Sequence, residues 1–218
     1  MTQLADSSQE QVYQGQFGEF TITESDRLGV IVYRSSLMVA ALCFAIGSAL
    51  VLWQGNNLAI LQGLTPLYAC FCLALAVALA TIHIYMASLH RVLQLFWAIG
   101  AVAALVLAIQ NPEPLVFTVY NNPVAILGVG FTFAALTGIY FKEAFCFDRL
   151  ETKFLTPLVP LLLLGHLAGI LPVNLERFLL MSWATLFLIF GLRKLVQTVP
   201  ADIGDKSVFE YLKKKGNG

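Results

Sequence analysis

The sequence LTPLYACFCLALAVALATIHIYMASLHRVLQLFWAIGAVAALVLAI, residues 64–109, contains two long apolar runs. The runs cover about residues 64–86 and 90–109, and they are separated by a few residues that end before His90 and Arg91. A helix that crosses a bilayer needs about 20 mostly apolar residues, because each residue adds about 1.5 Å to a span of about 30 Å. The segment therefore predicts two membrane-spanning helices joined as a tight hairpin.

Four more apolar stretches lie at about residues 34–53, 123–141, 155–172 and 178–195. The last two are joined by a short turn and predict a second hairpin. Pro157 and Pro160 fall near the start of the fifth predicted span, where proline is tolerated. We therefore expect an all-α membrane protein with a six-helix transmembrane bundle over residues 34–195.

The composition agrees with a membrane protein. The chain of 218 residues is 58% hydrophobic and 12% charged, with a mean hydropathy of +0.77. Soluble domains usually carry about 25% charged residues. The formal net charge is zero, so we expect membrane lipids around the protein and no nucleic-acid partner.

The basic residues fall on one side of the six-span arrangement. Only Arg177, beside Glu176, falls on the other side. Basic loops stay on the cytoplasmic side of a membrane, so both termini are expected to be cytoplasmic or stromal. The twelve residues on the basic side are Arg27, Arg34, Arg91, Lys142, Arg149, Lys153, Arg193, Lys194, Lys206, Lys213, Lys214 and Lys215.

Residues 1–33 form a polar N-terminal segment. It has no basic region ahead of an apolar one, so we expect no cleaved signal peptide. Residues 11–22 favour a short strand lying on the membrane. Thr23 or Ser25 can then cap the N-terminus of an interfacial helix.

Residues 196–218 form a tail that we expect on the cytoplasmic side. Asp205 can cap a helix that carries Val208, Phe209 and Leu212 on one face, with lysines around them. Such a helix would lie at the interface and be attracted to anionic headgroups. A solvated tail without fixed structure is the alternative interpretation.

Catalytic and transport signals are missing from the sequence. None of the thirteen acidic and thirteen basic residues falls in the middle of a predicted span, whereas ionisable groups at membrane depth mark ion and proton pathways. We find no HExxH, GxSxG, P-loop or dinucleotide-binding glycine motif, so we expect no catalytic residues and no enzyme activity. The four cysteines lie in or beside apolar stretches, and we expect neither disulfides nor a metal site. They are Cys43, Cys70, Cys72 and Cys146.

Three histidines are the remaining candidates for chemistry: His83, His90 and His166. A hairpin turn at about 86–90 would put His90 at the surface. His166 lies eleven residues into the fifth predicted span, ~16 Å below the inner surface, whereas His83 would be only ~5–7 Å deep. We expect no cofactor, and the competing interpretation is that His166 binds a chlorophyll magnesium or a haem iron as a single axial ligand. The simplest alternative is a neutral histidine bonded to a neighbouring helix.

Small residues at helical spacing predict close helix packing. Gly165 and Gly169 are four apart in the fifth span, and Ala134 and Gly138 repeat this spacing in the fourth span beside Thr137. Such faces let another backbone approach closely. They predict contacts within the bundle or with a partner protein.

The segment TGIYFKEAFCFDRLETK, residues 137–153, is the most distinctive loop. One interpretation is a charge-balanced connector whose long side chains reach the headgroups. The other is a docking surface for a partner protein. The candidate partner-binding residues are Lys142, Glu143, Phe145, Phe147, Asp148, Arg149, Gly165 and Gly169.

Five segments together resemble a family of uncharacterised multi-pass membrane proteins of cyanobacteria and plastid-bearing eukaryotes. They are DRLGVIVYR (26–34), HIYMASLHR (83–91), FKEAFCF (141–147), GHLAG (165–169) and DIGDKSVFEYL (202–212). The similarity extends from about residue 13. It implies a thylakoid membrane location and a role in the assembly of photosystem II.

These observations favour a non-catalytic accessory or assembly factor that binds a larger photosynthetic membrane complex, most of all a photosystem II assembly intermediate. The first alternative is a small-solute channel or facilitator lined by Thr81, His83, Thr137 and His166. The second is a pigment- or haem-binding protein that uses His166. The identity of the partner, the stoichiometry and the assembly stage are left open.

Overall fold

The computed structural model describes residues 12–55 and 57–216. Within these residues, six helices are long and apolar enough to cross a membrane. The predicted all-α, six-span fold is therefore confirmed. The six helices are α1 (Glu24–Gln54), α2 (Leu58–Thr81), α3 (Ala87–Gln110), α5 (Ile126–Phe147), α6 (Leu150–Leu167) and α7 (Val173–Val196).

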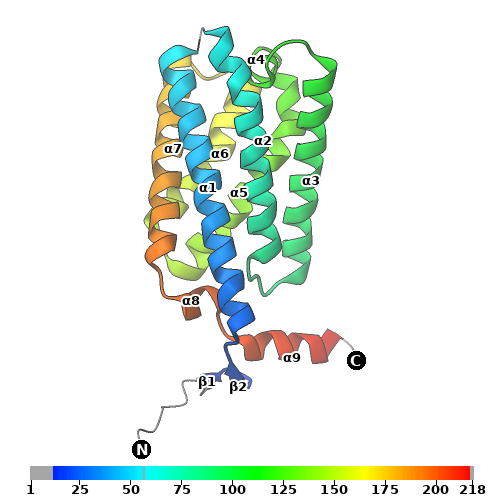
Figure 1. Ribbon diagram of the computed structural model, residues 1–218, viewed down its shortest axis with the longest axis vertical. Helices are drawn as coiled ribbons and strands as arrows, with labels where there is room; N and C mark the ends of the chain where they lie inside the picture. The colour runs from blue at the N-terminus through cyan, green and yellow to red at the C-terminus, as the bar shows by residue number, and fades with distance from the viewer. Residues whose placement is uncertain (1–11, 56, 217–218) are drawn as a thin grey trace, which may run out of the picture.

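The six long helices run up and down in one bundle (Figure 1). Helix α1 packs between α2 and α7, and α5 packs between α3 and α6. Contacts of α6 with α7 and of α2 with α3 complete the ring. Two short elements that the sequence did not predict, α4 (Leu115–Asn121) and the 3-10 helix η1 (Pro123–Ala125), cover one end.

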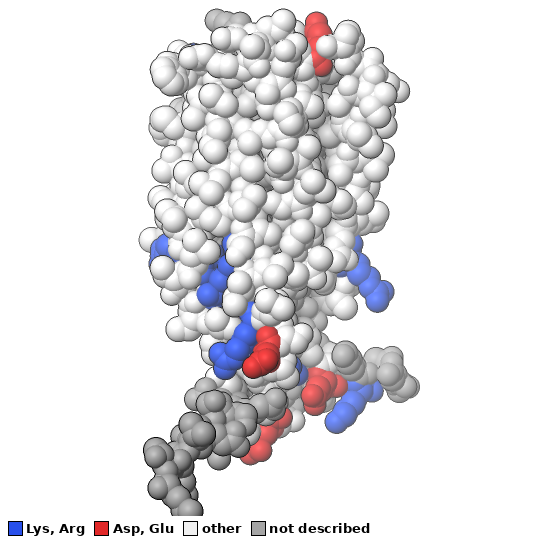
Figure 2. All heavy atoms as spheres, in the orientation of Figure 1, with Lys and Arg blue, Asp and Glu red and all other residues white. Residues whose placement is uncertain are grey.

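The opposite end carries the basic side chains, and we call it the basic end. Figure 2 shows blue Lys and Arg side chains in the lower part of the molecule and a wide uncharged band above them. The far end has Glu113 before α4 and Glu176 and Arg177 in the first turn of α7. The charges thus mark two boundaries with an apolar layer between them, as a bilayer requires.

Two helix boundaries differ from the predicted ones. Thr23 caps α1 with a capping box, in which its hydroxyl accepts the Asp26 N–H at 3.2 Å. Residues 24–33 are consequently the first turns of α1, not a separate interfacial helix. Helix α6 begins at Leu150, so Pro157 and Pro160 lie in its interior. Prolines are tolerated there because neighbouring groups in a membrane bundle can compensate for the lost backbone bonds.

Aromatic rings fill the centre of the bundle. Phe44 of α1 lies 4.4 Å from Trp183 of α7 between ring centroids, and Phe133 of α5 lies 5.2 Å from the same ring. The buried Trp183 indole donates to the Tyr140 hydroxyl at 3.2 Å. Packing of this kind gives the indole N–H a partner in the apolar core of the bundle.

Glycines bring α3 and α5 close together. A Cβ atom on Gly100 would overlap the Thr132 backbone N and lie 3.0 Å from its Cα. A Cβ on Gly128 would lie 2.8 Å from the Ala103 Cβ, and one on Gly138 would overlap Leu93. The predicted small-residue face around Gly138 is therefore used within the bundle.

Both ends of the described chain meet below the basic end and form what we call the terminal platform. It consists of a hairpin of β1 (Val12–Gly15) and β2 (Gly18–Thr21), with α8 (Val199–Ile203) and α9 (Lys206–Gly216). The Gln16 N–H donates to Asp205 Oδ2 at 2.6 Å, and the Phe17 and Tyr211 rings stack at 4.0 Å. Asp205 also accepts the Ser207 N–H at 2.9 Å, which agrees with its predicted role as a helix cap. Residues 1–11 of the predicted N-terminal segment lie outside the described residues.

Candidate functional site

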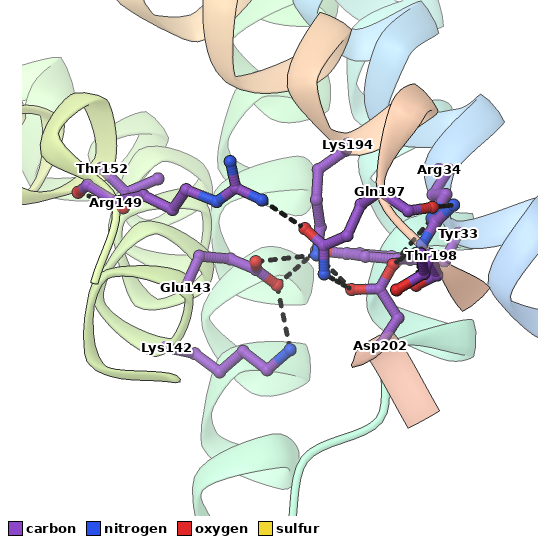
Figure 3. A network of polar contacts seen from close by, with 10 residues as sticks. All are labelled: Tyr33, Arg34, Lys142, Glu143, Arg149, Thr152, Lys194, Gln197, Thr198 and Asp202. Atoms are coloured by element: carbon purple, nitrogen blue, oxygen red, sulfur yellow. Dashed lines mark hydrogen bonds and ion pairs between the residues drawn. The ribbon is translucent and has the colours of Figure 1, made fainter. Parts of the chain in front are cut away.

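A buried network of ionised side chains closes the basic end (Figure 3). Its centre is Asp202 of α8, whose side chain is 2% exposed. Asp202 accepts from Arg34 Nε at 2.7 Å and from Gln197 Nε2 at 3.2 Å, and it forms an ion pair with Lys194. Three elements, α1, α7 and α8, therefore meet at one carboxylate.

Lys194 extends this network to α5. Its Nζ atom lies 2.8 Å from Glu143 Oε2, and the Glu143 side chain is 1% exposed. Glu143 Oε1 also accepts from Lys142 Nζ at 2.9 Å and from the Tyr33 hydroxyl at 3.2 Å. The Phe147 ring lies under the Lys194 ammonium, 4.5 Å away from centroid to nitrogen.

Pairing explains how these charges stay buried. An isolated buried charge is strongly destabilising, whereas an ion pair with further hydrogen bonds can be kept. Arg34 uses its remaining donors on the Gln197 and Thr198 carbonyl oxygens, at 2.5 and 3.0 Å, at the C-terminal end of α7. The five ions are three cations and two anions: Arg34, Lys142, Lys194, Glu143 and Asp202. The arrangement fixes four helices against one another and offers no vacant acid or base.

The structure divides the predicted docking loop into two parts. Lys142 and Glu143 belong to the buried network, and Arg149 donates to the Gln197 side chain at 3.0 Å. The prediction that Glu143 is a surface residue is wrong, because α5 turns this side chain inward to Lys194. Phe145 is 83% exposed and the Asp148 side chain is 86% exposed, so these two remain available at the surface.

Gly165 and Gly169 do not form a helix-packing face. Gly169 has a φ of +66° and lies after the end of α6. Its N–H donates to the His166 carbonyl at 2.9 Å, and the Ile170 N–H donates to the Gly165 carbonyl at 3.1 Å. This is a Schellman motif, which favours glycine at the left-handed position. A Cβ on Gly165 would contact Leu171 at 2.6 Å, a residue of the same turn.

His166 lies near the far end of the bundle, not ~16 Å below the inner surface. It is the penultimate residue of α6, because this helix begins and ends five residues earlier than predicted. Its Nδ1 lies 2.6 Å from Glu176 Oε1 and its Nε2 lies 3.1 Å from the Tyr120 carbonyl oxygen. Both ring nitrogens have partners, so axial binding of a chlorophyll or haem would first have to break one of these contacts.

The other histidines lie at the basic end. His83 is half-buried in the turn before α3, and burial lowers the pKa of its ring. His90 is in the first turn of α3, where its Nε2 lies 2.5 Å from the Leu79 carbonyl oxygen of α2. It is therefore half-buried and not at the surface as predicted.

The residues proposed to line a channel do not share one path. Thr81 and His83 lie at the basic end and His166 at the far end. Thr81 and Thr137 each donate their hydroxyl to a carbonyl of their own helix, at 2.8 and 2.7 Å. Among the described residues, no group of three or more His, Cys, Asp or Glu side chains could hold a metal ion.

Comparison with known protein families gives a match over residues 77–211. The matched family is described as uncharacterized integral membrane protein (DUF2301). The chain belongs to this family. The matched stretch includes Glu143, Lys194 and Asp202 of the network, while the family match leaves α1 with Arg34 outside. The comparisons with curated proteins and with solved structures each gave no match.

Membership of the DUF2301 family confirms the family expected from the sequence and agrees with the six apolar helices. The chain is therefore a multi-pass integral membrane protein, in contact with lipids. Sequence reasoning misses Asp202 and Lys194 as site residues. Each of these two charged residues lies within one turn of a helix end. A hydropathy profile uses a charge at that position only to mark where a span ends, so it gives no sign that the side chain is buried.

Proposed function

We propose that this protein is a non-catalytic accessory factor that binds a larger membrane complex through its basic end. The observation that supports the proposal is that the ionised groups of the network pair with one another. The buried ions of the network, Arg34, Glu143, Lys194 and Asp202, are paired with one another, and aromatic rings fill the middle of the bundle. The surface is what remains for interaction, and it includes the exposed Phe145 near the end of α5 and the exposed Asp148 after that helix.

The proposed partner is a photosynthetic membrane complex, first of all a photosystem II assembly intermediate in the thylakoid membrane. This step comes from the resemblance to proteins of cyanobacteria and plastid-bearing eukaryotes. The basic end would face the cytoplasm or stroma, because twelve of the thirteen basic residues belong to it. Reporter fusions after Lys214 and in the loop around Asp148 should stay on that side. A reporter after Glu113 that stays there too would contradict this orientation.

Affinity purification from native membranes tests the docking surface. The variant is Phe145→Ala with Asp148→Asn, which removes an exposed ring and an exposed charge without touching the buried network. Trp53→Ala is the matched control, because Trp53 is also 83% exposed but lies at the far end. Lys142, Glu143 and Arg149 are left unchanged, because their replacement would disrupt the network.

We expect the double variant to accumulate normally and to lose co-purifying photosystem II subunits, identified by mass spectrometry. The Trp53 control should retain them at wild-type yield. If the double variant keeps the same subunits at the same yield, the loop is only a connector and the docking proposal fails. If the double variant instead loses subunits of another membrane complex, the docking surface is supported and photosystem II is rejected as the partner.

A further inference from the structure

His166, Glu176 and Tyr120 form a polar cluster at the far end, where α6, α7 and α4 meet. His166 Nδ1 lies 2.6 Å from Glu176 Oε1, and His166 Nε2 lies 3.1 Å from the backbone carbonyl oxygen of Tyr120. The Tyr120 hydroxyl donates to Glu176 Oε2 at 3.2 Å, and its ring stacks on His166 with centroids 4.9 Å apart. One histidine thus connects α4 to the start of α7.

The hydrogen-bond geometry of this cluster requires an extra proton. A backbone carbonyl can only accept, so His166 Nε2 must carry a hydrogen. Nδ1 faces a carboxylate oxygen at hydrogen-bond distance, so a second hydrogen must lie between Nδ1 and Glu176 Oε1. A neutral imidazole beside an ionised carboxylate has a single N–H and cannot make both bonds.

We propose that His166 and Glu176 together form a proton-binding site whose bound proton holds α4 against the α6–α7 hairpin. The proton lies on the imidazole or on the carboxylic acid, and the pair is neutral in either case. When the proton leaves, one N–H remains for two acceptors. It will pair with the ionised Glu176, because bonds to charged acceptors are about twice as strong. The Tyr120 carbonyl then loses its donor, and the attachment of α4 at this point weakens, because the Tyr120 hydroxyl bond to Glu176 and the ring contact with His166 remain.

The elements around the pair contribute few other ionisable groups. The neighbouring Arg177 points away and donates to the Leu52 carbonyl oxygen of α1 at 2.9 Å. The α6–α7 turn (168–172), η1 and the first turns of α5 have no ionisable side chain. Burial and the nearby Glu176 carboxylate raise the pKa of Tyr120, so its hydroxyl remains a donor at neutral pH.

Nitrogen NMR of histidine-labelled protein in lipid nanodiscs tests the proton count directly. The His166 signals can be assigned by their loss in His166→Gln. We expect both ring nitrogens to be engaged with hydrogens at about pH 5 and one to lose its hydrogen as the pH rises to about 9. A ring with one bare nitrogen at every pH in this range would overturn the proposal.

Hydrogen exchange of the α4 amides tests the mechanical consequence. After correction for the chemical exchange rate, protection of residues 115–121 should fall at least about tenfold above the titration, as loss of a hydrogen bond in a charged cluster predicts. Glu176→Gln is the matched control, because its amide can donate to Nδ1 while Nε2–H still donates to Tyr120. Protection in that variant should not depend on pH. If protection in the wild-type protein is also independent of pH, the proton does not hold α4 and that part of the proposal is overturned. The NMR experiment on the wild-type protein tests the proton site even if a variant fails to fold.

Discussion

Replacement of Asp202 by Asn tests whether charge holds the basic end together. Asp202 Oδ2 accepts from Arg34 Nε at 2.7 Å, while Oδ1 accepts from Gln197 at 3.2 Å and pairs with Lys194. An Asn side chain has the same shape but presents one oxygen and one NH2 group. Its NH2 must face either Arg34 or Lys194, so two donors would oppose each other in a buried site. The three cations of the network would also be left with one anion.

The expected loss follows from the burial of the pair. Breaking a buried ion pair by removing one partner costs about 3–5 kcal/mol. Asp148→Asn makes the same chemical change where the side chain is 86% exposed and pairs with Lys153. A surface pair contributes about 0–1 kcal/mol, and Asn tolerates the left-handed backbone that Asp148 adopts, with φ 51°.

Reversible unfolding by sodium dodecyl sulfate in mixed micelles measures both variants. The free energy of unfolding should fall by about 3–5 kcal/mol for Asp202→Asn and by less than about 1 kcal/mol for Asp148→Asn. Hydrogen exchange should also show α8 opening in the first variant only. Equal losses in the two variants would refute the reasoning, because burial would then have no effect.

Two further predictions concern packing and pH. Gly100→Ala should lower the free energy of unfolding by about 1–3 kcal/mol, because its Cβ would meet the Thr132 backbone. In the control Gly63→Ala the new Cβ meets nothing within 4 Å, so the free energy of unfolding should stay unchanged or rise by up to about 1 kcal/mol. Both variants are measured by unfolding in sodium dodecyl sulfate. A larger loss for Gly63→Ala than for Gly100→Ala would contradict the α3–α5 contact. The His83 ring should bind its proton at a lower pH than a free histidine does, because burial lowers its pKa. Since the fold favours the neutral ring, the contribution of His83 to stability is full above the ordinary histidine pKa and is lost as the pH falls. NMR titration of the His83 ring measures its pKa. A pKa at or above the ordinary histidine value would contradict the prediction.

Hydropathy predicted the six spans correctly but placed some of their ends poorly. The first turn of α6 contains Glu151 and Thr152, which are buried, so a search for apolar runs starts the helix too late. The error shifted His166 from the far end to the middle of the predicted span. Gly169 was assigned to a packing face for the same reason, although it ends the helix.

The buried network was beyond the reach of sequence reasoning. Its members come from four helices, and Arg34 and Asp202 are 168 residues apart. A single sequence shows each charge near a helix end, where a snorkelling residue and a buried partner look alike. Only the packing of α1, α5 and α7 decides that Glu143 points inward while Phe145 points outward. The family expected from the sequence is confirmed, whereas the photosystem II partner stays a prediction.

The terminal platform has a consequence for the order in which this membrane protein is completed. The Gln16 N–H donates to Asp205 across 189 residues of chain, and Arg34 pairs with Asp202 across 168 residues. During synthesis α1 enters the membrane long before its counter-ion exists, so the arginine must at first be accommodated by water or lipid phosphate. Asp202, which is made late, therefore neutralises a charge that is inserted early. Until Asp202 has been made, the basic end, where we propose that a partner docks, lacks a central part of its network, so recruitment of a partner should follow the synthesis of α8.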